Sequence, residues 1–191
     1  MNLISLLFYL WELLFYGKDG SSAQATDTYD YIMFAQDFPA TYCHISGECT
    51  PEISAKLHPN MFKIHGLWPS LNESEGPEFC DSSRPFDLSL LSGDLQDELH
   101  HWWASYNASD SDFWAHEWDK HGTCLKVSGK DVTQPSYFQR GLEESMSRFN
   151  ITEWIEAEGF RPNSTFSMSV AAMRALIKEK IGTTVSLFCE K

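Results

Sequence analysis

The chain has 191 residues and a formal net charge of −13, with 42% hydrophobic and 14% aromatic residues. This length and composition predict one folded domain with a real core and exclude a disordered chain. A protein that held nucleic acid mainly by phosphate charge would normally be basic, so this one avoids nucleic acid, binds a few nucleotides in a local pocket, or works at acid pH.

The N-terminal segment, residues 1–25, has the features of a secretory signal peptide. An apolar run, LISLLFYLWELLFY, is broken once by Glu12 and is followed by an A-x-A pattern at residues 23–25, although no Lys or Arg precedes the run. Cleavage there would release a single mature domain, residues 26–191. A membrane anchor is the alternative, but the run has about 14 residues and a spanning helix needs roughly 20.

Two strands are predicted after this segment. The first is YDYIMFAQDFP (29–39), ending at its proline, and the second is MFKIHGLWP (61–69). Between them we expect a loop over TYCHISGEC (41–49), whose two cysteines are close enough to close a small ring. Residues 70–86 are rich in Ser, Glu, Gly and Pro and predict a second loop.

The apolar spacing then becomes helical. It predicts helices over residues 92–106, 110–122, 134–150, 151–159 and 166–182, and a last strand over residues 183–189. Acidic residues are expected to N-cap the second helix, and Gly122 to end it. Because strands and helices are segregated along the chain, the fold class is predicted to be α+β.

The second predicted helix carries an unusual group of polar side chains. Within FWAHEWDKHGTC (113–124), His116, Glu117, Lys120 and His121 follow one another closely. At about 100° per residue they fall at about 0°, 100°, 40° and 140°, so all four share one broad helix face.

Three interpretations compete for this face. A zinc site is disfavoured, because the H-E-x-x-H pattern puts its histidines four apart whereas His116 and His121 are five apart, with a lysine between them that repels a cation. A solvated charged face is the second, although Phe113, Trp114 and Trp118 crowd the helix. Proton transfer beside a phosphate fits best, since imidazoles can donate and accept protons and Lys can hold negative charge.

A second candidate motif is FKIHGLWPS (62–70). His65 lies at a predicted strand end, and Trp68 follows it. Taken alone, the motif is explained by a core strand with one hydrogen-bonded histidine. Beside a phosphate site, however, the face of Trp68 could stack on a nucleobase.

The motif IHGLWP, followed about 45 residues later by FWAHEWDKHGTC, resembles the two active-site segments of the ribonuclease T2 family. The resemblance extends over roughly residues 29–189. It implies an α+β fold with a central antiparallel sheet and packed helices. It also implies a secreted endoribonuclease that works at acid pH without metal or cofactor.

The family's motif positions imply a role for each candidate. His121 resembles the general base that removes the 2′-OH proton, and His65 the general acid that protonates the leaving 5′-oxygen; the spacing alone leaves these two roles interchangeable. His116 resembles the phosphate-holding histidine, and Glu117 and Lys120 the pair that stabilises the phosphorane. The products implied are 2′,3′-cyclic phosphates and then 3′-phosphates.

The resemblance also implies a substrate and its contacts. We expect a monomer that binds single-stranded RNA, does not cut DNA because the 2′-OH is the nucleophile, and has no membrane contact after signal cleavage. Trp68, Phe113 and Gln36 are the expected base-binding residues. Ser70 stands where several relatives carry a side chain that reads the base, so base preference stays open.

Five cysteines and four N-x-[ST] sequons agree with the secretory route and a secreted, lysosomal or vacuolar destination. The sequons are at Asn72, Asn107, Asn150 and Asn163. The resemblance implies disulfides Cys80–Cys124 and Cys43–Cys49. Cys189 resembles a family cysteine whose partner lies further downstream, so the domain is expected to lack the usual last strands. A catalytically weak secreted protein that acts through binding is the alternative function.

Overall fold

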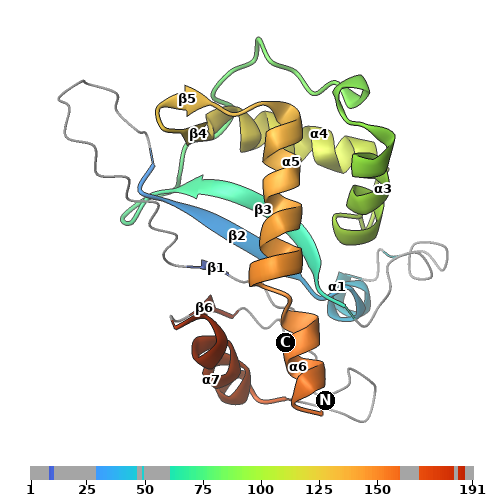
Figure 1. The fold of residues 1–191 in the computed structure, drawn as a ribbon, viewed down its shortest axis with the longest axis vertical. Helices are drawn as coiled ribbons and strands as arrows, with labels where there is room; N and C mark the ends of the chain where they lie inside the picture. Colours follow the sequence, from blue (N-terminus) through green and yellow to red (C-terminus); the bar gives the residue numbers. More distant parts are fainter. Residues whose placement is uncertain are drawn as a thin grey trace.

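A computed structural model describes residues 9–10, 29–46, 49, 61–159, 168–182 and 185–187 (Figure 1). Its elements, in chain order, are β1 Tyr9–Leu10, β2 Tyr31–Asp37, α1 Pro39–Ser46, β3 Lys63–Ser70, η1 Leu88–Leu90, α3 Gly93–Trp102, α4 Asp110–Lys120, η2 Gly122–Cys124, β4 Lys126–Val127, β5 Lys130–Asp131, α5 Gln134–Glu143, η3 Glu144–Arg148, α6 Ile151–Ala157, α7 Val170–Ile181 and β6 Val185–Ser186. The predicted strand and the predicted helix that carry the two candidate motifs are both present, as β3 and α4.

The antiparallel pair β2–β3 forms the centre of the molecule, and α5 crosses it in Figure 1. Its register contains a bulge: Ala35 pairs with Gly66, and the next residue, Gln36, pairs with Ile64. His65 is therefore the extra residue of β3, without a partner on β2. Because bulges bend a strand and redirect the side chain at the extra position, the register itself gives His65 a distinct orientation.

Buried aromatic side chains fix β3 against the helices. The indole nitrogen of Trp103, after α3, donates to the backbone oxygen of His65 at 2.8 Å. The Tyr137 hydroxyl, from α5, lies 3.4 Å from the Leu67 nitrogen, which donates to it. Trp103 and Tyr137 are fully buried, and such aromatic residues contribute much of the apolar area of a core. The strand that carries His65 is thus held at its backbone by two helices.

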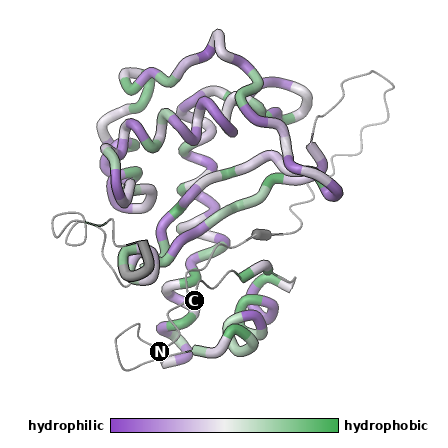
Figure 2. The backbone as a smooth tube through the Cα atoms, turned by 180° about the vertical axis from the view of Figure 1, so that it is seen from behind, coloured by the Kyte–Doolittle hydropathy of each residue, from purple (hydrophilic) through white to green (hydrophobic). Residues whose placement is uncertain are grey.

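The helices place apolar residues on this core. Along most described helices, hydrophilic and hydrophobic residues alternate in Figure 2, as expected of amphipathic helices that cover a core on one side. The helical spacing in the sequence located all five predicted helices, now α3, α4, α5, α6 and α7. In the third of them the last turn widens into the π-helical segment η3.

Two local predictions are wrong. The segment expected as a loop forms α1, which starts at Pro39, a residue suited to a first helical turn because its ring fixes φ and it needs no N–H partner. The N-cap of α4 is Ser109, whose side chain accepts from the Asp112 nitrogen; Asp110 and Asp112 instead occupy the first turn, where negative charge favours the helix dipole.

The α+β class with antiparallel strands is confirmed. The described strands form three two-stranded antiparallel sheets, β1–β6, β2–β3 and β4–β5, and β2–β3 is the central antiparallel sheet that was expected. The β4–β5 hairpin was not predicted; its turn residues Ser128 and Gly129 both have positive φ, as a tight hairpin with right-handed strand twist requires.

Several predictions concern residues beyond the described part of the chain. Most of the predicted signal peptide, Asn163 and Cys189 lie outside it. Tyr9–Leu10 of the predicted signal peptide pairs with β6 in the structure, and cleavage of the segment stays a prediction. In the described ranges, no helix combines the length and apolar character that a membrane span needs.

Candidate active site

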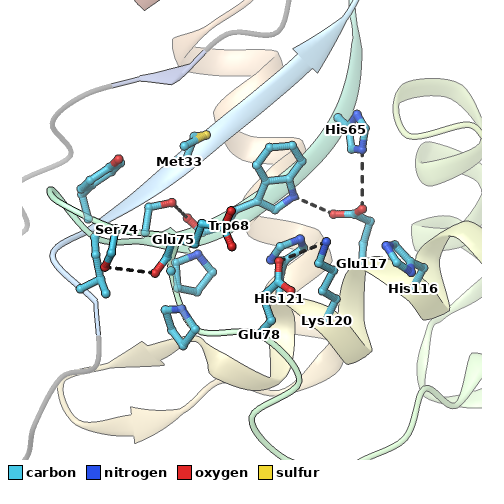
Figure 3. Close-up of a pocket in the computed structure, with 16 residues that line it drawn as sticks. Met33, His65, Trp68, Ser74, Glu75, Glu78, His116, Glu117, Lys120 and His121 are labelled. Carbon is cyan, nitrogen blue, oxygen red and sulfur yellow. Dashed lines mark hydrogen bonds and ion pairs between the residues drawn. The ribbon is translucent and has the colours of Figure 1, made fainter.

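A cleft of about 500 Å³ lies between β3, the loop after it and α4 (Figure 3). It brings together all five residues predicted to be catalytic, from two segments about 50 residues apart. Its lining residues are Tyr31, Met33, His65, Trp68, Pro69, Ser70, Leu71, Ser74, Glu75, Gly76, Pro77, Glu78, His116, Glu117, Lys120 and His121. In Figure 3 the side chains of β3 face those of α4 across this space.

The C-terminal end of α4 positions the helical half of the site. The helix ends at Lys120, and the nitrogen of His121 still donates to the Glu117 oxygen at 3.0 Å. Gly122 follows directly, and a Cβ there would lie 2.4 Å from the Trp118 ring. The chain can therefore turn tightly after His121, which keeps this imidazole on the same side as the preceding helical turn.

His65 lies between two carboxylates. Its Nδ1 is 2.7 Å from Asp37 Oδ2, and its Nε2 is 3.8 Å from Glu117 Oε1. Burial opposes the charged form, but the Asp37 charge and hydrogen bond, with the Glu117 charge, outweigh it and raise the pKa of His65 from 6.5 to about 9. The imidazole is therefore cationic across the physiological pH range and able to donate a proton.

Glu117 is the buried carboxylate at the centre of the site. It accepts a hydrogen bond from the Trp68 indole nitrogen at 2.9 Å. Its burial raises its pKa from 4.5 to about 7, although the His65 charge, the Trp68 hydrogen bond and Lys120 act in the opposite direction. Gly66 leaves room for this contact, since a Cβ there would lie 2.2 Å from both Glu117 Oε2 and Trp68 Nε1.

His121 has the opposite electrostatic character to His65. Burial, followed by the charges of Lys120, His116 and His65, lowers the pKa of His121 from 6.5 to about 3. Its ring stacks on Trp68, with centroids 5.3 Å apart and planes at 29°. Its Nδ1 is buried without a hydrogen-bond partner in the described part of the structure. The imidazole is therefore neutral and able to accept a proton.

Two further side chains bring positive charge to the cleft. Lys120 Nζ is 3.1 Å from Glu78 Oε1, which comes from the loop after β3. Burial and the neighbouring charges of Lys120 and His65 lower the pKa of His116, so this histidine is cationic only at acid pH. An anion entering the cleft would meet the Lys120 ammonium and compete with Glu78 for it.

The three predicted base-binding residues differ in their position relative to the cleft. Trp68 lines the cleft, whereas Phe113 is not among the lining residues but contacts the His65 ring edge to face, with centroids 5.6 Å apart. Gln36 does not line the cleft: it is buried, and its amide donates to Ser145 Oγ at 3.1 Å. Strand alternation explains this difference, because Tyr31 and Met33 of β2 line the cleft and Gln36, three residues after Met33, points to the opposite face of the strand.

Sequence reasoning missed two acidic residues of the site, Asp37 and Glu78. Asp37 had a detectable signal, since it is a carboxylate at the end of a mostly apolar strand and would be costly to bury without a partner. Glu78 had none, because its loop contains three glutamates in six residues and nothing in the sequence separates them.

Both disulfides implied by the resemblance are present. Cys80–Cys124 joins the loop after β3 to the segment after α4, with Cα atoms 5.0 Å apart. Cys43–Cys49 closes the small ring after β2. The first of these therefore connects the two halves of the cleft covalently.

The other predicted sites differ in their accessibility. Asn72 and Asn107 are exposed, whereas the Asn150 side chain caps α6 by accepting from the Glu153 nitrogen at 3.2 Å. Glycosylation at the sequons stays a prediction. Over the residues that the structure describes, no group of three or more His, Cys, Asp or Glu side chains is arranged to hold a metal ion.

Fold and cleft together define an α+β protein with a split acid–base site of histidines, a carboxylate and a lysine. The Ribonuclease T2 family model matches residues 29–191. Ribonuclease 1 of Arabidopsis thaliana is 34% identical over 174 residues, which cover 90% of this chain and 73% of the relative. The extracellular ribonuclease LE of Solanum lycopersicum is 31% identical over 172 residues, covering 88% and 72%.

Solved structures agree with the sequence relatives. RNase NT in complex with 5′-AMP superposes with a TM-score of 0.68 at 26% identity, covering 84% of this chain and 83% of that one. The chain therefore belongs to the ribonuclease T2 family and is a ribonuclease of the T2 type.

Proposed function

We propose that the protein is a secreted endoribonuclease that cleaves single-stranded RNA by metal-independent transesterification. The observation that carries this proposal is one cleft lined by two histidines in opposite surroundings: His65 lies between the Asp37 and Glu117 carboxylates, and its pKa is raised to about 9, whereas burial and nearby positive charges lower the pKa of His121 to about 3. Two titratable groups whose surroundings move their pKa values apart are suited to serve as an acid and a base at the same pH.

The proposed reaction begins with the RNA's own 2′-OH. Neutral His121 accepts the 2′-OH proton while the 2′-oxygen forms a bond to phosphorus. The bond from phosphorus to the 5′-oxygen breaks, and cationic His65 donates a proton to that oxygen. The products are a 2′,3′-cyclic phosphate and a free 5′-OH, and the two histidines have exchanged protonation states. Water then opens the cyclic phosphate to a 3′-phosphate in a second, slower step with the roles reversed.

The remaining polar groups stabilise negative charge on phosphorus. Lys120 and protonated His116 are proposed to hold the phosphoryl oxygens, which gain charge in the phosphorane. Glu117 holds Trp68 in place, and it donates a hydrogen bond to a phosphoryl oxygen when it is protonated, which its pKa of about 7 permits. Because His116 has a lowered pKa, we expect phosphate binding, and with it activity, to fall towards neutral pH.

RNA is the proposed substrate because the mechanism needs a 2′-OH, so DNA is not cut. The nucleotide bound to RNase NT is consistent with a nucleotide site in this fold. We propose that Trp68 and Phe113 provide aromatic contacts for bases on the two sides of the cut. Gln36 is buried and is not proposed to bind a base. Local cations and stacking explain how a chain of net charge −13 binds RNA.

The secretory route is proposed from three observations. Residues 1–25 have the features of a signal peptide, the structure contains two disulfides, and ribonuclease LE is named as extracellular. Disulfides of this kind form and persist in oxidising compartments. We accordingly propose residues 26–191 as the mature catalytic domain.

The activity is tested by incubating the purified protein with single-stranded RNA at about pH 5 in excess EDTA. Cyclic-phosphate ends on the early products are expected, and single-stranded DNA is expected to stay intact. Activity that disappears with EDTA would contradict the metal-independent mechanism. A folded protein that binds RNA without cutting it would favour a binding role instead.

The two histidines are tested by substitution. His65→Phe and His121→Phe are each expected to lower kcat at least 100-fold, within the range that general acid–base groups contribute, while circular dichroism stays unchanged. His101→Phe is the matched control, because His101 is exposed on α3 outside the cleft. Retained cleavage by either cleft variant would refute its assigned role.

A further inference from the structure

We propose that Asp37 is a positioning residue for the reaction, whose carboxylate holds the His65 imidazole with Nε2 directed into the cleft as the proton-donating atom. This inference rests on the proposed function and deepens it. Asp37 was not among the residues suggested by either active-site motif.

The geometry of the pair fixes which imidazole nitrogen reacts. Asp37 Oδ2 is 2.7 Å from His65 Nδ1, so this nitrogen carries a hydrogen that it donates to the carboxylate. Nε2 points the other way, 3.8 Å from Glu117 Oε1 in the cleft. Nε2 is therefore the atom that would deliver a proton to the leaving oxygen. A hydrogen bond at the second imidazole nitrogen is the usual means of fixing tautomer and ring orientation.

Backbone structure keeps the pair together. Asp37 is the last residue of β2 and is 5% exposed. His65 is the extra residue of the bulge in β3, and its backbone oxygen accepts from Trp103. In a regular antiparallel register His65 would pair with Gln36, and the bulge removes that pairing. The bulge and the Asp37 carboxylate therefore both determine the orientation of the His65 side chain.

The charges facing His65 favour its cationic form. Asp37 comes from β2, Glu117 and Lys120 come from α4, and Tyr106, from the loop after α3, lies close enough to Asp37 to feel its charge. Two carboxylates act against one ammonium. This balance agrees with a His65 pKa of about 9, because burial alone would lower it.

A second Asp–His pair provides a matched comparison. His100 Nδ1 is 2.5 Å from Asp110 Oδ2, but this pair lies outside the cleft. The Asp110 carboxylate also accepts from the Ser105 nitrogen at 2.8 Å, so it has a structural role at the start of α4. Losing Asp110 should therefore affect stability, whereas losing Asp37 should affect proton donation.

The experiment compares two substrates that share their upstream nucleoside. One is a dinucleoside monophosphate, whose alkoxide leaving group needs a proton. The other is a nucleoside 3′-(4-nitrophenyl phosphate), whose phenolate leaves without one. Because both substrates need His121 and His116 equally, the ratio of their kcat/KM values isolates the general acid.

We expect the ratio for the wild-type protein to stay constant between about pH 5 and 8. In Asp37→Asn the same ratio should fall about tenfold for each pH unit across the upper part of this range. At each pH, kcat/KM of this variant for the nitrophenyl substrate should stay within about threefold of the wild-type value. Asp110→Asn should leave the ratio unchanged.

A ratio for Asp37→Asn that follows the wild type would overturn the proposal, and so would an equal loss on both substrates. Inactivity of the folded wild-type protein on both substrates would instead overturn the proposed function. NMR titration of ¹⁵N-labelled wild-type His65 tests the pair without activity and without the variant. A Nδ1–H resonance and titration well above the ordinary value of about 6.5 support the proposal. The opposite tautomer, or titration near the ordinary value, would refute it.

Discussion

His65 and His121 carry the same imidazole, but their neighbours move their pKa values in opposite directions. His65 has two carboxylates beside it, whereas His121 is affected by burial and by the positive charges of its neighbours, Lys120 foremost. This difference was not available from the sequence, where the spacing left the acid and base roles interchangeable. It depends on Asp37, which lies 28 positions from His65 and reaches it only through the β2–β3 register.

At the same scale, Gly66 is expected to be essential to the geometry of the site. Gly66→Ala would place a Cβ 2.2 Å from both atoms of the Trp68–Glu117 hydrogen bond, so at least one of these side chains must move. We expect kcat/KM for RNA to fall at least about tenfold, because small displacements of catalytic groups are costly. The free energy of unfolding should fall by about 1–3 kcal/mol.

Gly93→Ala is the control for this substitution. A Cβ at Gly93, the first residue of α3, meets no atom within 4 Å. The activity of the Gly93→Ala variant should be unchanged. Its free energy of unfolding should be equal or slightly higher, since Ala lowers the conformational entropy of the unfolded chain. Full activity in Gly66→Ala would show that the contact between Trp68 and Glu117 is not needed.

The elements show which sequence signals are reliable. Apolar spacing predicted α3 to α7. The four polar side chains expected on one helix face do line one cleft, with His121 directly after the last residue of α4, because their placement follows from local helix geometry. The signals failed for α1, for the β4–β5 hairpin and for the bulge at His65. α1 is a short helix whose apolar residues do not follow a helical period, the hairpin depends on two positive-φ turn residues, and the bulge depends on strand register.

Cys80–Cys124 is the connection between elements that matters most for the cleft. Its loop spans a sequence separation of 44, against 6 for Cys43–Cys49. The chain-entropy relation gives about 4 kcal/mol for the longer loop and about 2 kcal/mol for the shorter. Replacing both cysteines of the longer loop by Ala should therefore lower the free energy of unfolding more, as measured by urea denaturation.

Removal of Cys80–Cys124 should also weaken cleavage, because it frees the loop carrying Glu78 from the end of α4. We expect at least a tenfold loss in kcat/KM under conditions where the variant is still folded. The matching Ala pair at Cys43 and Cys49 should lose stability with little change in kcat/KM. Equal losses of activity in both variants would show that the longer disulfide has no special role at the site.

For the whole molecule, the groups in the cleft connect stability to pH. The folded pKa of His121 is about 3 against an ordinary 6.5, so stability falls as the pH drops from 6.5 towards 3, where only the unfolded chain takes up this proton. His65 acts in the opposite sense: its contribution is complete below 6.5 and is lost as the pH rises to about 9. The contribution of Glu117 is complete below 4.5 and is lost by about pH 7.

These contributions predict a stability maximum between pH 4.5 and 6.5, where the opposite slopes of His121 and Glu117 offset each other. Above it, the loss from His65 is reinforced by self-repulsion in a chain of net charge −13. Thermal unfolding across this pH range should show the maximum. His65→Phe should flatten the alkaline side, and His121→Phe the acid side. An alkaline decline that survives unchanged in His65→Phe would mean that the His65 carboxylate pairing does not contribute to folding stability.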